Sequence, residues 1–270
     1  MKNTPLRTSL LAALLAAAGA PAPAPLSAAP ALDSLRSMAP LPARSAEAPE
    51  LPPAAGEQLR PGVFDAAPER VFYITPSDVD LSLFPEPPAA GSAEDSADLA
   101  EVKRWQAART AEQCRAAQAQ EHASYESFFG SISPFGQYTP KAVSRILDKV
   151  KADTSYVDYT LKRRYQRPRP FLRDDSISPC LAKTSGYSYP SGHSTAARVF
   201  GLLLSDLAPS GAAQFMAYSD QAALNRVIGG VHHPSDIEAG KKLGDAVYAA
   251  LKRNSAFRKD LAELKKYLKP

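Results

Sequence analysis

Residues 140–170 read PKAVSRILDKVKADTSYVDYTLKRRYQRPRP, and this stretch decides the fold class. Its apolar side chains recur at intervals of three and four, which places them on one face of a helix. These residues are Val143, Ile146, Leu147 and Val150. Pro140 suits the first turn of a helix, whereas Pro168 and Pro170 end one. The stretch therefore predicts a long amphipathic helix with one buried side.

Further helical patterns lie on both sides of that stretch. A proline-free run rich in Ala, Glu, Gln, Arg and Lys predicts a helix over 93–129. Its expected buried residues are Leu99, Val102, Trp105 and Ala108. After a loop over 171–189, helices are expected over 191–207, 210–224, 234–251 and 255–268. Because no useful strand pattern occurs, we expect an all-α fold, a single helical-bundle domain.

The first 60 residues differ from the rest in composition. They hold 10 of the 25 prolines and no aromatic residue, so they offer few anchors for a packed core. Basic residues followed by LLAALLAAAGA at 10–20 predict a signal peptide within residues 1–31. We expect a disordered Pro/Ala-rich linker over 32–60, a folded domain over 61–270, and a periplasmic or secreted protein. An uncleaved membrane anchor is the alternative, although the apolar run is short for a bilayer span.

Two cysteines, Cys114 and Cys180, fit a single disulfide in an oxidising compartment. They fit two unpaired core thiols equally well, and their spacing does not distinguish the two interpretations. No Cys-x-x-Cys pair or histidine cluster accompanies them, so they do not indicate a metal site.

The formal net charge of +4 could suggest nucleic-acid or membrane binding. Residues 252–270, however, contain seven basic and two acidic residues, a local excess larger than that of the whole chain. A solvated, lysine-rich helix end explains this excess, because cations are favourable at a helix C-terminus. We therefore expect no nucleic-acid partner. No second apolar run approaches transmembrane length, so we expect no membrane insertion of the mature domain.

The first of three chemically unusual segments begins at Lys162 and ends at Pro170. It holds five cations in eight residues, and two prolines flank Arg169. Those prolines fix the backbone, so Arg169 is presented rigidly. The planar guanidinium can bond two phosphate oxygens at once, whereas Lys162 acts as a point charge. By itself, a basic helix end is the simpler interpretation.

The second segment is Tyr189-Pro190-Ser191-Gly192-His193, directly before an apolar helix. Ser191 is a suitable N-cap, and Gly192 lets the backbone approach a ligand closely. The free amides of a helix start, with the macrodipole, favour an anion, and His193 would lie beside it. A serine nucleophile is an alternative, but the segment lacks the Gly-x-Ser-x-Gly elbow.

The third segment, NRVIGGVHHPSD, covers residues 225–236 and contributes another cation, Arg226. Asp236 lies four residues after His232, about one helical turn further on. It can accept a proton from the His232 ring, which leaves the other ring nitrogen as a nucleophile. His233 competes for this role, with a spacing to Asp236 that is less favourable for the same geometry. A satisfied core histidine is the alternative.

Together these segments resemble the signature of the type 2 phosphatidic acid phosphatase (PAP2) superfamily, which includes vanadium haloperoxidases and the class A bacterial non-specific acid phosphatases. That signature is Lys-x6-Arg-Pro, Pro-Ser-Gly-His and Ser-Arg-x5-His-x3-Asp. The matching positions are Lys162, Arg169, Pro190, Ser191, Gly192, His193, Arg226, His232 and Asp236. One position departs, because Asn225 stands where the family usually has serine. The resemblance is closest to the class A acid phosphatases and covers roughly residues 138–252.

The resemblance implies a PAP2/haloperoxidase-type fold and a metal-independent acid phosphatase for small soluble phosphomonoesters. His232 would be the nucleophile that forms a phosphohistidine, with Asp236 orienting it and His193 acting as general acid and base. The phosphate-binding residues would be Lys162, Arg169, Ser191, Gly192 and Arg226. The resemblance implies no cofactor, inhibition by vanadate and a mildly acidic optimum. A homo-oligomer is compatible with the sequence but is not indicated by it.

Three other functions use the same residues. A vanadium-dependent haloperoxidase would bind vanadate at the phosphate site, but such relatives are usually much longer. A lipid phosphatase would be expected to carry several membrane helices, which this chain lacks. A phosphate-binding module without catalysis is the third alternative, although all the catalytic side chains are present. Transfer of phosphate to an alcohol instead of water also stays open.

Overall fold

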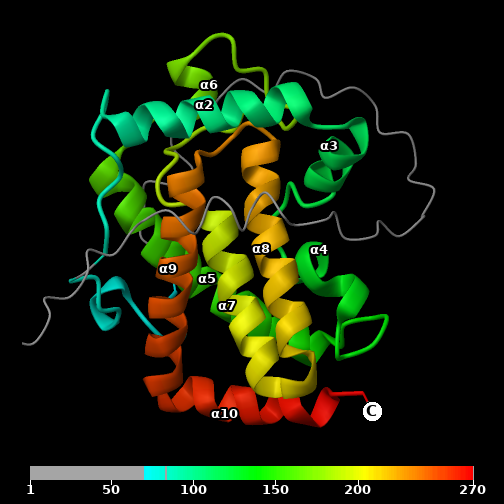
Figure 1. Cartoon of the computed structure of the whole chain (residues 1–270). Helices are drawn as coiled ribbons and strands as arrows, with labels where there is room; N and C mark the ends of the chain where they lie inside the picture. Colours follow the sequence, from blue (N-terminus) through cyan, green and yellow to red (C-terminus); the bar gives the residue numbers. More distant parts are fainter. Residues whose placement is uncertain (1–69, 83, 270) are drawn as a thin grey trace, which may run out of the picture. The chain divides into compact units, whose positions relative to one another are not determined.

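The computed structural model describes residues 70–82 and 84–269. All regular secondary structure in these residues is helical, so the expected all-α fold is confirmed (Figure 1). The predicted signal peptide over 1–31 and the linker over 32–60 lie outside the described residues, as does the proposed domain start at residue 61.

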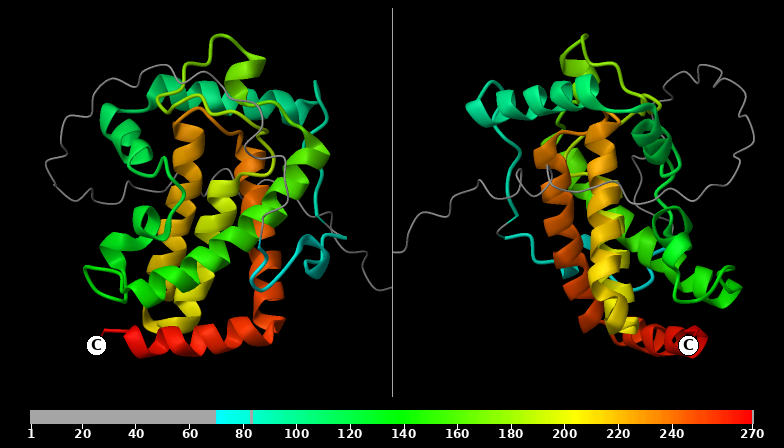
Figure 2. Two further views of the ribbon diagram at one scale, coloured as in Figure 1. Left: turned by 180° about the vertical axis from the view of Figure 1, so that it is seen from behind. Right: turned by 45° about the vertical axis from the view of Figure 1, so that its right-hand side comes forward.

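The helices form a bundle, with one helix lying across each of its two ends. They are α2 (Ala93–Ala108), α3 (Ala111–Gln118), α4 (Tyr125–Phe129), α5 (Lys141–Tyr165), α6 (Pro170–Arg173), α7 (Gly192–Leu207), α8 (Ala212–Ile228), α9 (Pro234–Arg253) and α10 (Ser255–Leu264). Short 3-10 turns cover Pro76–Asp78, Gly130–Ile132, Pro209–Gly211 and Lys265–Tyr267. The views in Figures 1 and 2 show α7, α8 and α9 side by side, with α5 crossing them obliquely. Helices α2 and α10 lie across opposite ends of this group.

The core forms around α7, whose apolar residues are buried on several sides. Leu203 and Leu204 are completely buried, as expected for a helix surrounded by other helices. All four residues of the predicted α5 stripe are also buried in this core. The extended segment before α2 packs on the same core through Tyr73 and Ile74.

Two glycines let α9 approach α7 closely. A Cβ atom on Gly240 would lie 2.5 Å from the Ser191 carbonyl oxygen and 2.8 Å from Ser194 Cβ. A Cβ atom on Gly244 would lie 2.6 Å from Arg198 Cβ. Both positions are too close for any side chain, so this pair fixes the separation of the two helices near their N-termini.

The prediction of one helix over 93–129 is wrong, because this region forms α2, α3 and α4. Thr110 and Ser124 each begin a new helix in extended conformation, and their hydroxyls accept hydrogen bonds from the amides of Gln113 and Ser127. Such caps compete with continuation of the preceding helix.

The predicted buried side of α2 is also partly wrong. Val102 is completely buried, but Ala108 is exposed. The other buried residues of this helix are Asp95 and Asp98. Helix α2 therefore turns two carboxylates, and not an apolar stripe, toward the rest of the protein.

Smaller differences concern helix ends. Pro140 is the N-cap of α5 and not its first helical residue, and α5 ends at Tyr165, before the two prolines. Helix α6 interrupts the expected loop, and α8 continues to Ile228, where two glycines follow. None of the helices in the described ranges combines the length and apolar character that a bilayer crossing requires.

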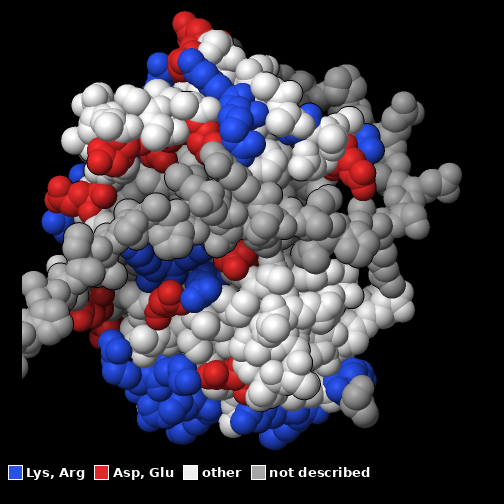
Figure 3. Space-filling model, viewed as in Figure 1, with Lys and Arg blue, Asp and Glu red and all other residues white. Residues whose placement is uncertain are grey.

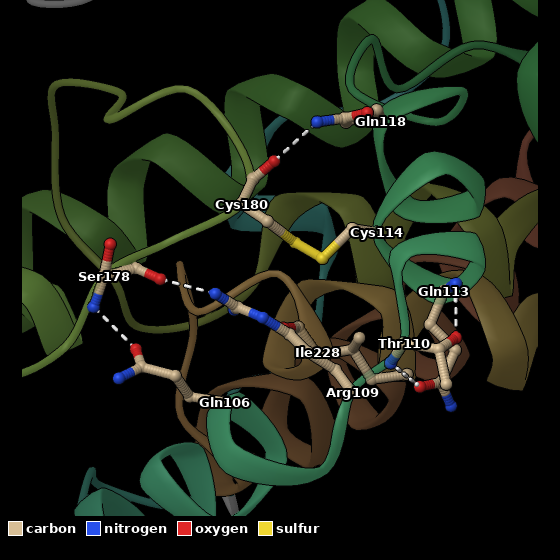
Figure 4. The surroundings of a disulfide bond; sticks show 9 residues. All are labelled: Gln106, Arg109, Thr110, Gln113, Cys114, Gln118, Ser178, Cys180 and Ile228. Atoms are coloured by element: carbon tan, nitrogen blue, oxygen red, sulfur yellow. Dashed lines mark hydrogen bonds between the residues drawn. A yellow bond between two sulfur atoms is a disulfide. The ribbon is translucent and has the colours of Figure 1, made fainter.

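Cys114 and Cys180 form a disulfide, which decides between the two interpretations that the sequence left open (Figure 4). The bond joins α3 to the loop before α7, with Cα atoms 5.9 Å apart. Gln118 Nε2 donates to the Cys180 carbonyl at 2.9 Å, and Arg109 Nη2 donates to the Ser178 carbonyl at 2.6 Å. The covalent bond and these contacts hold α3 against the loop.

Basic side chains gather at the end of the bundle where α10 lies (Figure 3). Several of them form ion pairs on the surface: Lys252 lies 2.8 Å from Asp206, and Lys266 lies 2.6 Å from Glu263. Their exposure fits the interpretation of this segment as a solvated helix end.

Candidate active site

The structure brings the three unusual segments into direct contact. Arg169 Nη1 of the first segment lies 3.1 Å from His232 Nε2 of the third. Lys162 Nζ donates to the Pro190 carbonyl of the second segment. The Ser191 amide donates to the Asp236 carbonyl at 2.9 Å, which joins the second segment to the third. The predicted site residues therefore share one buried location, at the N-terminal ends of α7 and α9.

The protonation of His232 follows from its partners. Its Nε2 faces a guanidinium, which can only donate, so this nitrogen carries no hydrogen. Its Nδ1 lies 3.3 Å from Asp236 Oδ2 and donates to that carboxylate. Burial and the charge of Arg169 hold the pKa of His232 well below 6.5. His232 is thus a neutral imidazole whose bare nitrogen faces a cation.

His233 corrects an expectation about spacing, because its bond to Asp236 is the shorter one. Its Nδ1 lies 2.9 Å from Asp236 Oδ2, and its backbone amide donates to the same oxygen at 2.7 Å. Its Nε2 accepts from Arg173 Nη1 at 3.0 Å. Both ring nitrogens of His233 are therefore engaged, by Asp236 and Arg173, so sequence spacing was the wrong criterion for separating the two histidines. The two histidines differ in the cation that Nε2 faces, which is Arg169 for His232 and Arg173 for His233.

Arg226 has donor groups without acceptors. The residue is only 2% exposed, and its Nε and Nη1 have no hydrogen-bond partner in the described part of the chain. Burial, together with the charge of Arg169, lowers the pKa of Arg226 to about 9. Unsatisfied buried donors are costly, and an anion with several oxygens would satisfy them.

Arg169 and Lys162 contribute two more buried cations. Arg169 donates to the carbonyls of Gly186 at 3.2 Å and Val231 at 2.9 Å, and Lys162 donates to the Tyr187 carbonyl at 3.0 Å. Carbonyl oxygens orient these cations without neutralising them. Burial lowers the pKa of Lys162, and the charge of Arg169 acts in the same direction, against that of Asp158.

Asp158 is a site residue that sequence reasoning missed. It is buried on α5, one turn before Lys162, and its Oδ2 lies 3.9 Å from Lys162 Nζ. The same oxygen lies 2.7 Å from where a Cβ atom on Gly192 would be, so Asp158 requires glycine there. Burial raises the pKa of Asp158 to about 6, although Lys162 and Arg169 oppose this. Its spacing of four from Lys162 was the signal that could have identified it.

The start of α7 supplies the amides of the site. Ser191 is the N-cap, and its hydroxyl accepts from the Ser194 amide at 3.4 Å. The first amides of a helix have no acceptor within the helix, and the macrodipole makes its N-terminus favourable for anions. The 16-residue α7 therefore directs this end toward the cations of the first and third segments.

His193 is held from outside the three segments. Its Nε2 lies 3.1 Å from the Gln120 carbonyl oxygen and 2.9 Å from that of Glu121. Carbonyls only accept, so Nε2 carries the hydrogen, and Nδ1 is the nitrogen that can exchange a proton. Burial lowers the pKa of His193 well below 6.5, as does the charge of Arg226.

Around His233 and Asp236 lies a group of charged and polar side chains, which we call the rear network. It consists of Asp95, Asp98, Arg167, Arg173, Ser188, His233, Ser235 and Asp236. Arg167 is central to it: Nη1 donates to Asp236 Oδ1 at 2.8 Å, and Nη2 donates to Asp95 Oδ1 at 2.9 Å and Asp98 Oδ2 at 2.8 Å.

Asp236 belongs to both the site and the rear network. Burial opposes its ionisation, yet its contacts with His233 and His232 hold its pKa well below the usual range. The Ser188 hydroxyl also donates to it. Asp236 is therefore a fixed carboxylate.

Within the described residues, no group of three or more potential metal-ligating side chains is arranged to hold a metal ion.

Comparison with known proteins gives matches at the level of family, sequence and fold. Residues 151–259 match the PAP2 superfamily model. A non-specific acid phosphatase of Salmonella typhi is 30% identical over 135 residues, which are 48% of this chain and 54% of that protein. One of Providencia stuartii is 26% identical over 212 residues, 72% of this chain and 84% of that protein. The match to the Salmonella protein thus spans about half of its length.

Among solved structures, a bacterial vanadium-dependent iodoperoxidase has a similar fold. Its TM-score is 0.51 at 20% identity, and the match covers 62% of this chain and 52% of that one. At this identity the likeness concerns the fold alone.

Proposed function

We propose that this chain, whose residues 151–259 belong to the PAP2 superfamily, is an acid phosphatase that hydrolyses small soluble phosphate monoesters. The observation that carries the proposal is the set of buried cations that includes Arg169, which contacts His232, and Arg226, which has unsatisfied donors. Arg169 lies 3.1 Å from the bare ring nitrogen of His232, and its charge also acts on Arg226, a buried guanidinium with unsatisfied donors. Such an arrangement suits a tetrahedral anion placed for attack by that nitrogen.

In the proposed complex, the phosphate oxygens are bound by cations and helix amides. Arg169, Arg226 and Lys162 neutralise the charge, and Ser191 and the Gly192 amide bind the oxygens nearest α7. Because these groups are buried and already oriented, little reorganisation is needed when charge develops in the transition state.

His232 is the proposed nucleophile. Its Nε2 forms a bond to phosphorus while the phosphorus–oxygen bond of the ester breaks, and His193 gives its Nδ1 proton to the departing oxygen. Asp236 stabilises the His232 imidazolium through Nδ1. In the second step His193 accepts a proton from water, the water oxygen attacks phosphorus, and the phosphorus–nitrogen bond breaks. Inorganic phosphate leaves and His232 is again neutral. No metal takes part in this scheme.

This mechanism has a definite pH dependence. Burial and the charge of Arg226 lower the pKa of His193 in the free protein, so the proton donor is formed only at acidic pH. A bound phosphate dianion counteracts Arg226 and raises that pKa. We therefore expect kcat/KM to fall as pH rises above the acidic range. A profile of kcat/KM from pH 4 to 8 measures this.

The test combines turnover with chemical trapping. We expect hydrolysis of p-nitrophenyl phosphate that survives chelator and is inhibited by vanadate. Quenching in alkali, which preserves phosphohistidine, should leave phosphate on the peptide that contains His232, and H232A should lack that label. Loss of turnover with chelator would contradict the metal-free scheme, and a label elsewhere would contradict the nucleophile.

We also propose that the protein acts outside the cytoplasm. The disulfide between Cys114 and Cys180 supports this, because such bonds persist in oxidising compartments. Cell fractionation with N-terminal sequencing of the mature protein tests both the location and the cleavage within residues 1–31. An uncleaved chain in the cytoplasmic fraction would contradict the proposal.

A further inference from the structure

Asn225 lies directly before Arg226, at the position where the PAP2 signature has serine. Its side chain is buried, with 3% of the residue exposed. Gln221 Nε2 donates to Asn225 Oδ1 at 2.9 Å, which fixes the orientation of the amide. Asn225 Nδ2 in turn donates to Gln120 Oε1 at 2.8 Å. Both the oxygen and the nitrogen of the Asn225 amide are thus bonded to glutamine side chains.

Gln120 connects this amide to the candidate proton donor. It lies between α3 and α4, and its backbone carbonyl and that of Glu121 are the acceptors for His193 Nε2. The Glu121 carboxylate accepts from the Ala182 amide at 3.2 Å. The turn that holds His193 is therefore anchored through the Gln120 side chain to α8 and through Glu121 to the loop before α7.

Serine would not make the same connection. Its hydroxyl is one bond from Cβ, whereas the asparagine nitrogen is two bonds away, so serine would not reach Gln120 Oε1 without movement of the turn. A single hydroxyl would also be shared between Gln221 and Gln120. The departure from the family pattern thus coincides with a contact that depends on an amide.

We propose that Asn225 is a positioning residue for His193 and acts through Gln120. By holding the Gln120 and Glu121 carbonyls, it keeps the hydrogen of His193 on Nε2 and aims Nδ1 at the leaving oxygen. The role rests on the proposed function, because it matters when His193 gives a proton to that oxygen. Asn225 itself touches neither the phosphate nor the reacting atoms.

A leaving-group comparison tests this role. Nitrophenolate departs without a proton, whereas the alkoxide of glycerol 2-phosphate requires one. Single-turnover formation of phosphohistidine should slow about 10- to 100-fold for glycerol 2-phosphate in N225A and Q120A, because general acid catalysis contributes about 100-fold or more. For p-nitrophenyl phosphate the same variants should lose less than about 3-fold, since that step needs no donor.

Three further variants make the comparison specific. The double variant N225A/Q120A should be no slower than either single variant, since both break one connection. N225S should behave like N225A. Q118A, which removes a nearby contact to the Cys180 carbonyl, should leave both rates unchanged and serves as the control. Equal losses on both substrates would indicate a merely structural role and would overturn the proposal, as would no loss.

Nitrogen NMR of the His193 ring separates this inference from the proposed function. The wild-type ring should show one tautomer with hydrogen on Nε2, and N225A should show a mixture of tautomers. This readout needs no turnover. If neither substrate were hydrolysed, the phosphatase assignment would fail while the tautomer still tested the positioning. An unchanged tautomer in N225A would overturn the positioning role even in an active enzyme.

Discussion

Arg167 and Arg169 lie on either side of Pro168 and are 6% and 7% exposed, yet their surroundings differ completely. Arg167 donates to three carboxylates and a hydroxyl. Arg169 donates to two carbonyls and an imidazole nitrogen, none of which carries a negative charge. Equal burial therefore gives one neutralised arginine and one whose charge stays available to an anion.

The same contrast extends to two regions of the protein. In the rear network two arginines face three aspartates, and the charges are paired at hydrogen-bonding distance. The front of the site, as we call the group of Lys162, Arg169 and Arg226, contains one carboxylate that lies outside the rear network, Asp158. Its Oδ2 is 3.9 Å from Lys162 Nζ. The rear network holds Asp236 in place, and the front retains positive charge for a ligand. Four predictions test this division.

The largest effect on activity is expected when the two adjacent histidines are substituted one at a time. H232A removes the proposed nucleophile and should lower kcat by about 10⁴-fold or more, because loss of a nucleophile removes the covalent route. H233A should retain much more activity but lose stability, because Asp236 and Arg173 lose a buried partner. Steady-state kinetics and thermal unfolding of both variants measure the difference. A larger loss of kcat in H233A would reverse the assignment of front and rear.

Next, substitution of the two arginines should affect different quantities: stability for Arg167 and kcat/KM for Arg169. R167M removes the cation that three buried carboxylates share, of which Asp95 still keeps Arg173, and should lower the free energy of unfolding by about 3–5 kcal/mol. R169M should retain stability and lower kcat/KM by about 100-fold or more, because it removes charge from the transition state. Denaturant unfolding and kcat/KM are compared for each variant. Similar profiles for the two would show that the division between the regions is wrong.

The third prediction concerns the disulfide, which closes a loop of the chain that contains Arg167 and Arg169. Its two cysteines are 66 positions apart in the sequence. C114S/C180S should lower the free energy of unfolding by up to about 4 kcal/mol, because the unfolded chain gains freedom. Activity at a temperature where the variant stays folded should change little. Denaturant unfolding of the oxidised protein and the double variant provides the measurement, and unchanged stability would contradict it.

The smallest effect concerns the one carboxylate at the front. Burial raises the pKa of Asp158 to about 6, above its usual 3.8, so its stabilising contribution is present at low pH and is lost as pH rises through about 6. D158N should match the wild type near pH 4 and exceed its free energy of unfolding near pH 8 by up to about 3 kcal/mol. Unfolding at both pH values tests this, and a pH-independent difference would contradict it.

The features that could be predicted from the sequence are those controlled by local pattern, such as apolar periodicity and helix caps. The apolar stripe of α5 is buried as expected, and α7 begins at the capping residue Ser191. Contacts between distant segments could not be predicted in this way. Nothing local to Asp95 or Asp98 indicates an ion pair with Arg167, about 70 residues further on.

Two other differences have the same cause. Thr110 and Ser124 were potential caps within a strongly helical composition, and only tertiary packing decides whether such residues are used. Likewise, His232 and His233 are neighbours whose roles depend on which arginine each ring meets. The contact between Asn225 and Gln120 joins residues 105 positions apart, and no sequence period connects them.

The close contact of α7 and α9 has a consequence for engineering this protein. A Cβ atom on Gly240 would lie 2.5 Å from the carbonyl oxygen of Ser191, and the Ser191 amide is bonded to Asp236. One added methyl group would therefore displace the start of α7 and the carboxylate that contacts the histidines together. A library that aims at new substrates should therefore keep residues 240 and 244 fixed. Diversity belongs in the loop around Tyr187, which is 37% exposed and borders Lys162. Substitutions in this loop are the most compatible with both altered substrate selectivity and retained expression of the protein.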